Sequence, residues 1–113
     1  MITISKLREY GADVNSGLAR CVNNEALYLR LVAMVPNNDS FKKLYDAINN
    51  NDLDSAFLAA HSLKGISANL SINPIVDPVV EITELLRTKT AMDYSGLVSR
   101  IEEARKKLEE LCN

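Results

Sequence analysis

The residue best suited to chemistry is His61, the only histidine in the chain, because an imidazole is a good nucleophile near neutral pH. It lies in the stretch DLDSAFLAAHSLKGISANL, residues 52–70, whose apolar spacing predicts one long helix. Residues three, four and seven positions after His61 share its face of that helix. These are Lys64, Gly65 and Ala68, so a cation and a position without a side chain lie about one turn from the imidazole.

The apolar side of the same predicted helix faces a different direction. Its members recur at helical spacing and can enter a core: Leu53, Ala56, Ala60, Leu63, Ser67 and Leu70. We therefore expect His61 to be exposed, with Phe57 at the edge of the apolar face. Gly65 is harder to explain, because a glycine inside a helix costs about 1 kcal/mol relative to alanine. We expect the compensation to be another molecule that approaches the backbone closely.

Each of these residues also has an ordinary structural explanation. A single histidine on a helix is most often a surface or capping residue, and a helical lysine is most often a solvated charge. On residue types alone, a structural and a functional explanation of His61 both stay open.

The segment AHSLKGISANL, residues 60–70, closely resembles the signature of histidine-containing phosphotransfer (HPt) domains, in which a helix carries His-x-x-Lys-Gly followed by small residues. The resemblance extends upstream, where residues 10–32 look like the amino-terminal helices of many such domains. It weakens after Ile72, and Ser71 stands where many relatives have glycine, which concerns the exit from the helix. The matching positions are Ala60, His61, Leu63, Lys64, Gly65, Ser67, Ala68, Asn69 and Leu70.

The resemblance implies a phosphocarrier that relays a phosphoryl group between receiver-domain aspartates through a phosphohistidine at His61. Lys64 would stabilise the negative charge of the phosphoryl oxygens, and Gly65 would let the receiver approach. The implied reacting atom of His61 is Nε2. The implied partners are receiver domains of response regulators or hybrid histidine kinases, and Mg²⁺ would be bound by the receiver, so that this chain needs no cofactor.

A receiver that covers the imidazole should meet apolar side chains around it. Phe57 and Leu58 flank His61 by helical angle, and Ala68 lies on the same face. By analogy with the family, further contacts are expected from the preceding short helices at Leu18, Val22 and Tyr28. The ordinary explanation of each of these residues is packing in the core.

Several other functions are disfavoured by the sequence. There is no Gly-x-x-x-x-Gly-Lys-Ser/Thr loop, so we expect no kinase activity with ATP, and the chain is not expected to be an enzyme in its own right. A net charge of −2 argues against nucleic acid, and no apolar run is long enough for a membrane span. No second histidine accompanies His61, so no metal site is expected. Cys21 and Cys112 are far apart in sequence, which favours reduced thiols and a cytoplasmic protein. We also expect a monomer.

Two alternatives to phosphotransfer remain. One is a helical protein-interaction module whose histidine is not phosphorylated, and the retention of both His61 and Lys64 argues against it. The other is a histidine-dependent hydrolase, although Ser62 and Ser67 point away from the His61 face.

Both a free-standing protein and a domain cut from a hybrid sensor kinase fit the composition. The initial methionine and the short length favour the first.

The elements that must position these residues are all helical. We expect an all-α single domain over residues 1–113, an antiparallel four-helix bundle with short additional N-terminal helices. In the helix at 25–35 the expected apolar stripe is Leu27, Leu31 and Met34, with Tyr28 and Val32 beside it. The expected helices cover residues 4–10, a short segment after the N-cap Asp13, 25–35, 40–50, 52–70, a segment from Ile75 or Pro78 to Arg87, and a last one capped by Asp93 that reaches Leu111.

Overall fold

The computed structural model describes all 113 residues and contains helices and no strands. Every expected helix is present, with boundaries within two residues of the expected ones except at the start of the sixth helix, for which Ile75 and Pro78 were both expected. No helix has the length and apolar character needed to cross a membrane. In chain order the elements are α1 (Ile4–Tyr10), α2 (Val14–Arg20), α3 (Glu25–Met34), the 3₁₀ turn η1 (Val35–Asn37), α4 (Asp39–Asn49), α5 (Leu53–Asn69), α6 (Asn73–Arg87) and α7 (Ser95–Cys112).

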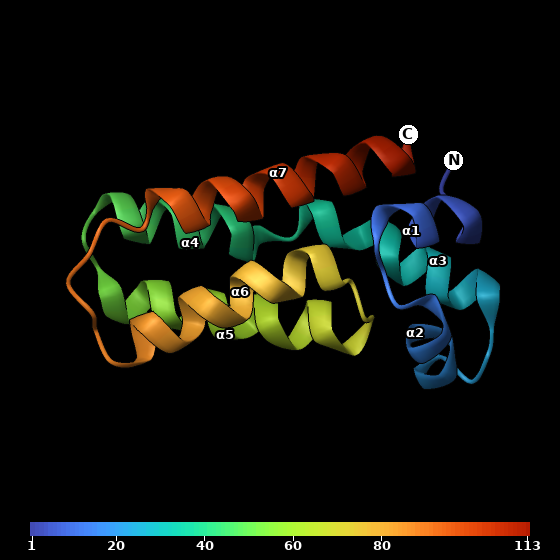
Figure 1. Ribbon diagram of the computed structural model, residues 1–113, viewed down its shortest axis with the longest axis horizontal. Helices are drawn as coiled ribbons and strands as arrows, with labels where there is room; N and C mark the ends of the chain where they lie inside the picture. The colour runs from blue at the N-terminus through green and yellow to red at the C-terminus, as the bar shows by residue number, and fades with distance from the viewer.

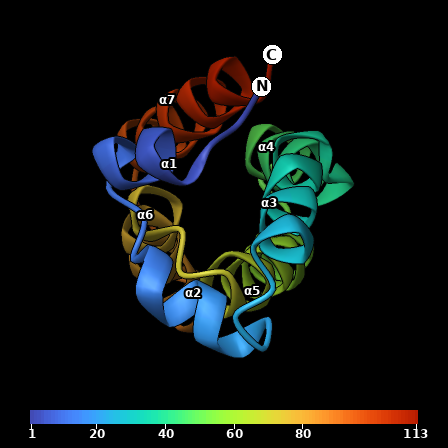
Figure 2. The same cartoon turned by 90° about the vertical axis from the view of Figure 1, so that its right-hand side faces the viewer.

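Helices α4 to α7 form an antiparallel four-helix bundle, and α1, α2 and α3 lie at one end of it (Figure 1, Figure 2). Within the bundle, α5 packs between α4 and α6, and α6 packs between α5 and α7. Polar contacts connect α7 to α4 and to η1. The Tyr45 hydroxyl donates to Glu102 Oε1 at 3.0 Å, and Arg105 Nη1 donates to the Pro36 carbonyl at 3.2 Å. The expected all-α bundle with short N-terminal helices is confirmed.

The inward face expected for α5 is buried in the core except at its first residue, Leu53, which is half-buried, and α6 packs a buried face against it. Each of the following residues is at most 1% exposed: Ala56, Ala60, Leu63, Ser67, Ile75, Val79, Ile82 and Leu86. The Ser67 hydroxyl donates to the Leu63 carbonyl at 2.7 Å, so this buried polar group is satisfied. Because the buried face of α5 is fixed in this way, its opposite face, which carries His61, is held toward solvent.

The two ends of α5 are defined by side chains. Hydrogen bonds from the Ser55 side chain and backbone hold the pKa of the N-cap Asp52 below its ordinary value. After the last turn, Ser71 has a left-handed φ of 56°, a conformation that glycine adopts without strain. Arg20 of α2 donates to the Ala68 carbonyl at 3.0 Å and to Ser71 Oγ at 2.7 Å. These bonds fix the exit from α5 and attach α2 to it.

The start of α6 differs from the sequence expectation. The helix begins at Asn73, before Ile75 or Pro78, with Pro74 in its first turn and Pro78 inside it. An expected start at Pro78 was therefore wrong, and the helix begins two residues before the other expected start, Ile75. The physical reason is that Ile75 and Val79, on either side of Pro78, are both fully buried, so one apolar face continues through the proline. Packing of that face offsets the hydrogen bond that Pro78 cannot donate.

Gly17 of α2 lies against two other parts of the chain. A β-carbon built at Gly17 would lie 2.8 Å from the Leu70 carbonyl oxygen and would collide with the Tyr28 ring. We expect Gly17→Ala to lower the free energy of unfolding by about 1–3 kcal/mol, the usual range for overpacking, as measured by denaturant unfolding. The matched control is Gly96→Ala, whose β-carbon would meet nothing within 4 Å and should leave stability equal or slightly higher. Equal stability of the two variants would refute this packing account.

Candidate functional site

His61 lies at the middle of α5 and is exposed to solvent. Its neighbours on the same face are the half-buried Lys64 and the exposed Gly65. No salt bridge involves Lys64, so its ammonium group is not engaged by a carboxylate of this chain. The structure therefore brings together an imidazole, an unpaired cation and a glycine on one exposed helical surface, in the arrangement that the sequence predicts.

The surroundings of Gly65 differ from those of Gly17. A β-carbon built at Gly65 would meet nothing within 4 Å, although the residue lies inside a helix. The fold of this chain thus gives no packing reason for glycine here, and alanine would favour the helix by about 1 kcal/mol. This open space agrees with the expectation that the glycine serves the approach of another molecule.

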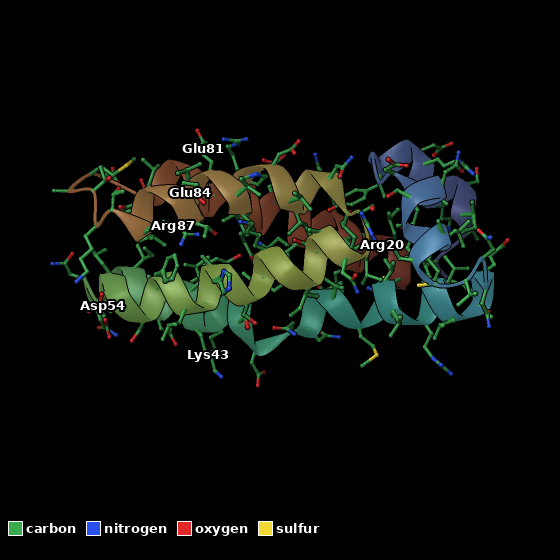
Figure 3. All side chains as sticks on the ribbon, turned by 90° about the horizontal axis from the view of Figure 1, so that it is seen from below. Arg20, Lys43, Asp54, Glu81, Glu84 and Arg87 are labelled. Atoms are coloured by element: carbon green, nitrogen blue, oxygen red, sulfur yellow. The ribbon has the colours of Figure 1, made fainter.

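The ring of Phe57 lies beside His61 in an offset-stacked arrangement. The two ring centroids are 5.9 Å apart, and the ring planes differ by 13°. The guanidinium carbon of Arg87, from α6, lies 5.0 Å from the Phe57 centroid, within range of a cation–π contact. Figure 3 shows Arg87 on α6, on the side of that helix that faces α5. Arg87 was not predicted as a site residue, because no sequence signal shows which residue of a neighbouring helix reaches this place.

The remaining residues expected to contact a partner occupy two regions. Leu58 on α5 is 67% exposed, and Val22, just after α2, is 86% exposed. Leu18 and Ala68 are half-buried. Leu18 lies on α2, which Arg20 attaches to the C-terminal end of α5, and Val22 follows α2. Leu58 lies on α5, three residues before His61. Val22 also has a left-handed φ of 55°, which is unusual for a β-branched residue.

Tyr28 does not belong to this surface. Its side chain is completely buried, and its hydroxyl donates to the Leu70 carbonyl at 2.9 Å. Burial, with smaller contributions from Cys21 and Asp13, raises the pKa of the Tyr28 phenol above its ordinary value. The prediction that Tyr28 contacts a partner was therefore wrong, because the residue connects α3 to the end of α5 in the core.

The error at Tyr28 follows from the orientation of α3. The expected stripe of Leu27, Leu31 and Met34 is not the buried face, since Met34 is 65% exposed. The buried residues of α3 are Tyr28 and Val32. Apolar residues surround this helix on nearly all sides, so their spacing does not select one face.

His61 lies on an open surface and not in a cavity. None of the surface hollows of the protein has His61 among its lining residues. One hollow, between α4 and α5, includes Leu58 and Ser62 among its lining residues from α5. Ser62 Oγ is 3.3 Å from Ser40 Oγ, so the serine beside the histidine points toward α4. The arrangement suits a reaction in which a second protein supplies the rest of the site.

Comparison with known proteins identifies the family. The family model of the Hpt domain matches residues 37–113, more than half of the chain, and the chain belongs to this family. The matched segment begins at Asn37, the last residue of η1, and contains all four bundle helices, including α5 with His61. It continues past Ile72, where the resemblance had been expected to weaken, and it leaves out residues 1–36. No curated protein and no solved structure matches the chain. Hpt domains are phosphocarriers of two-component signalling that interact with receiver domains.

Proposed function

We propose that this protein relays a phosphoryl group between receiver-domain aspartates, with His61 as the residue that carries it. The observation that carries the proposal is the exposed position of the only histidine at the centre of α5, next to Lys64 and Gly65, within the matched Hpt segment. The donors and acceptors would be receivers of response regulators or of hybrid histidine kinases.

In the proposed reaction, the lone pair of His61 Nε2 attacks the phosphorus atom of an aspartyl phosphate. The nitrogen–phosphorus bond forms while the bond from phosphorus to the aspartate oxygen breaks, and the receiver's carboxylate leaves with that electron pair. The Nδ1–H proton stays on the ring. Negative charge on the three equatorial oxygens would be stabilised by Lys64 and by Mg²⁺ bound to the receiver, so this chain itself would use no metal. The reverse steps deliver the group to a second receiver.

The direct test is incubation of the full chain with a phosphorylated, radiolabelled receiver domain. We expect label on this chain that is lost in acid and kept in alkali, as a phosphoramidate is, and mass spectrometry should place it on His61. Acid-stable label would indicate a hydroxyl acceptor and would contradict the proposal. Stable binding to receivers without any label would favour the protein-interaction module instead.

Lys64 provides a second test of the same site. Because Lys64→Ala removes a cation next to developing negative charge, we expect transfer from the receiver to slow by about 10- to 100-fold. The label should still be on His61. Lys106→Ala is a suitable control, because Lys106 is an exposed lysine on α7, and its removal should leave the rate unchanged. Figure 2 shows that α7 lies across the bundle from α5. Equal rates in the two variants would mean that Lys64 is only a surface charge.

A further inference from the structure

The His61 side chain has few contacts that could order it. It is exposed, takes part in no hydrogen bond or salt bridge of the structure, and lines no hollow. An exposed side chain changes rotamer within picoseconds to nanoseconds. Transfer, however, requires the attacking nitrogen in line with the phosphorus atom. The stacked ring of Phe57, one helical turn earlier, is the contact that can restrict the imidazole.

Phe57 is in turn restrained from the neighbouring helix. The Arg87 guanidinium lies over the Phe57 ring. Arg87 also forms a bidentate salt bridge with Glu84. In that interaction Nε donates to Glu84 Oε2 at 3.2 Å and Nη2 donates to Oε1 at 3.4 Å. Figure 3 shows Glu84 and Arg87 near one another on α6. Glu84, Arg87, Phe57 and His61 therefore form a row in which each side chain contacts the next.

We infer that Phe57 and Arg87 are positioning residues, which hold the His61 imidazole in the orientation that phosphoryl transfer requires. The inference rests on the proposed function of His61. In this inference Phe57 does not serve to bind the receiver. Its ring orients the imidazole of His61 in the same chain. Arg87 lies on α6 and contacts Phe57 on α5. Through this contact the orientation of the imidazole depends on how α6 packs against α5.

The first test compares Phe57→Leu with Phe57→Tyr. Leucine keeps an apolar surface but cannot stack, whereas tyrosine keeps the ring. Transfer should be measured in single turnovers at increasing concentrations of a receiver that labels the unmodified protein. For Phe57→Leu we expect the maximal rate to fall about tenfold while the half-saturating receiver concentration stays the same. Phe57→Tyr should transfer at nearly the original rate. A raised half-saturating concentration with an unchanged maximal rate would assign Phe57 to docking and overturn the inference.

The second test measures the orientation of His61 without any phosphoryl transfer. Since His61 is the only histidine, its ring signals in an NMR spectrum need no further assignment. Three-bond couplings should report one dominant χ1 rotamer in the original protein and in Phe57→Tyr, and averaged values in Phe57→Leu. Couplings that do not change in Phe57→Leu would overturn the inference, even if transfer slows. If the original protein took up no label but showed the single rotamer, the proposed function would be contradicted. The stacking of Phe57 on His61 would still be supported.

Arg87 has a matched control in Arg100. Both arginines pair with a glutamate of α6, and their side chains are similarly exposed, 49% for Arg87 and 55% for Arg100. We expect Arg87→Met to lower the maximal transfer rate about threefold and to average the His61 couplings in part. Arg100→Met should change neither quantity. Because Arg87 is at the surface, this comparison also holds if Phe57→Leu fails to fold. Identical behaviour of the two arginine variants would remove Arg87 from the proposal.

Discussion

His61→Gln should take up no phosphoryl group from a phosphorylated receiver, because the glutamine amide is not a nucleophile and no second histidine can replace the imidazole. Since His61 is exposed and outside the core, the free energy of unfolding should change by no more than about 0.5 kcal/mol. Radiolabel transfer measures the first quantity, and thermal or denaturant unfolding measures the second. An inactive variant of unchanged stability would assign the loss to chemistry and not to the fold.

The control for this experiment is Ser62→Ala, the adjacent residue on α5. Ser62 is exposed and its only side-chain hydrogen bond is with Ser40 Oγ at 3.3 Å, so the variant should be labelled at the original rate. Normal labelling of His61→Gln would show that another nucleophile accepts the group and would overturn the assignment of His61.

Gly65→Gln should give a protein that is folded and at least as stable as the original but that transfers poorly. The new side chain enters open space, and glutamine favours a helix over glycine by up to about 1 kcal/mol. The same side chain would stand beside His61, where a receiver would come within bonding distance in the proposed transfer. A displacement of about 1 Å can lower the rate of an oriented reaction about 100-fold, so we expect a loss of that order in single-turnover transfer.

Two controls separate docking from chemistry at Gly65. A small phosphodonor such as phosphoramidate needs no docking surface, so it should label Gly65→Gln at nearly the original rate. Gly96→Gln, at another glycine whose β-carbon would meet nothing, should not affect transfer from the receiver. Normal transfer from the receiver to Gly65→Gln would mean that no close approach occurs at this glycine.

Much of the fold could be predicted because the faces and ends of its helices depend on residues that are close together in the sequence. The spacing from Leu53 to Leu70 defines both the buried and the exposed face of α5, and Asp52 marks where the helix begins. The placement of His61, Lys64 and Gly65 on one exposed surface follows from helical geometry alone. The contact between Phe57 and His61 is of the same kind, since the residues are one turn apart.

The features that could not be predicted depend on how helices pack against one another. Arg87 reaches Phe57 only because of the register between α5 and α6, which no spacing within α6 reveals. The burial of Tyr28 depends on which side of α3 faces α5, and α3 is apolar on most sides. At Pro78 the local rule for proline was outweighed by burial of the apolar face on either side of it.

The open position of His61 on the outside of the bundle has a consequence for signalling. Because no hollow of the chain encloses the imidazole, a phosphoryl group stored there would be in contact with bulk water between encounters. Storage time would then be limited by the intrinsic hydrolysis of the nitrogen–phosphorus bond, and the signal would decay unless an acceptor arrives first. In the proposed relay, the same openness would give donor and acceptor receivers equal access. The direction of flow would therefore be decided by the relative amounts and phosphorylation levels of the receivers, and not by this protein.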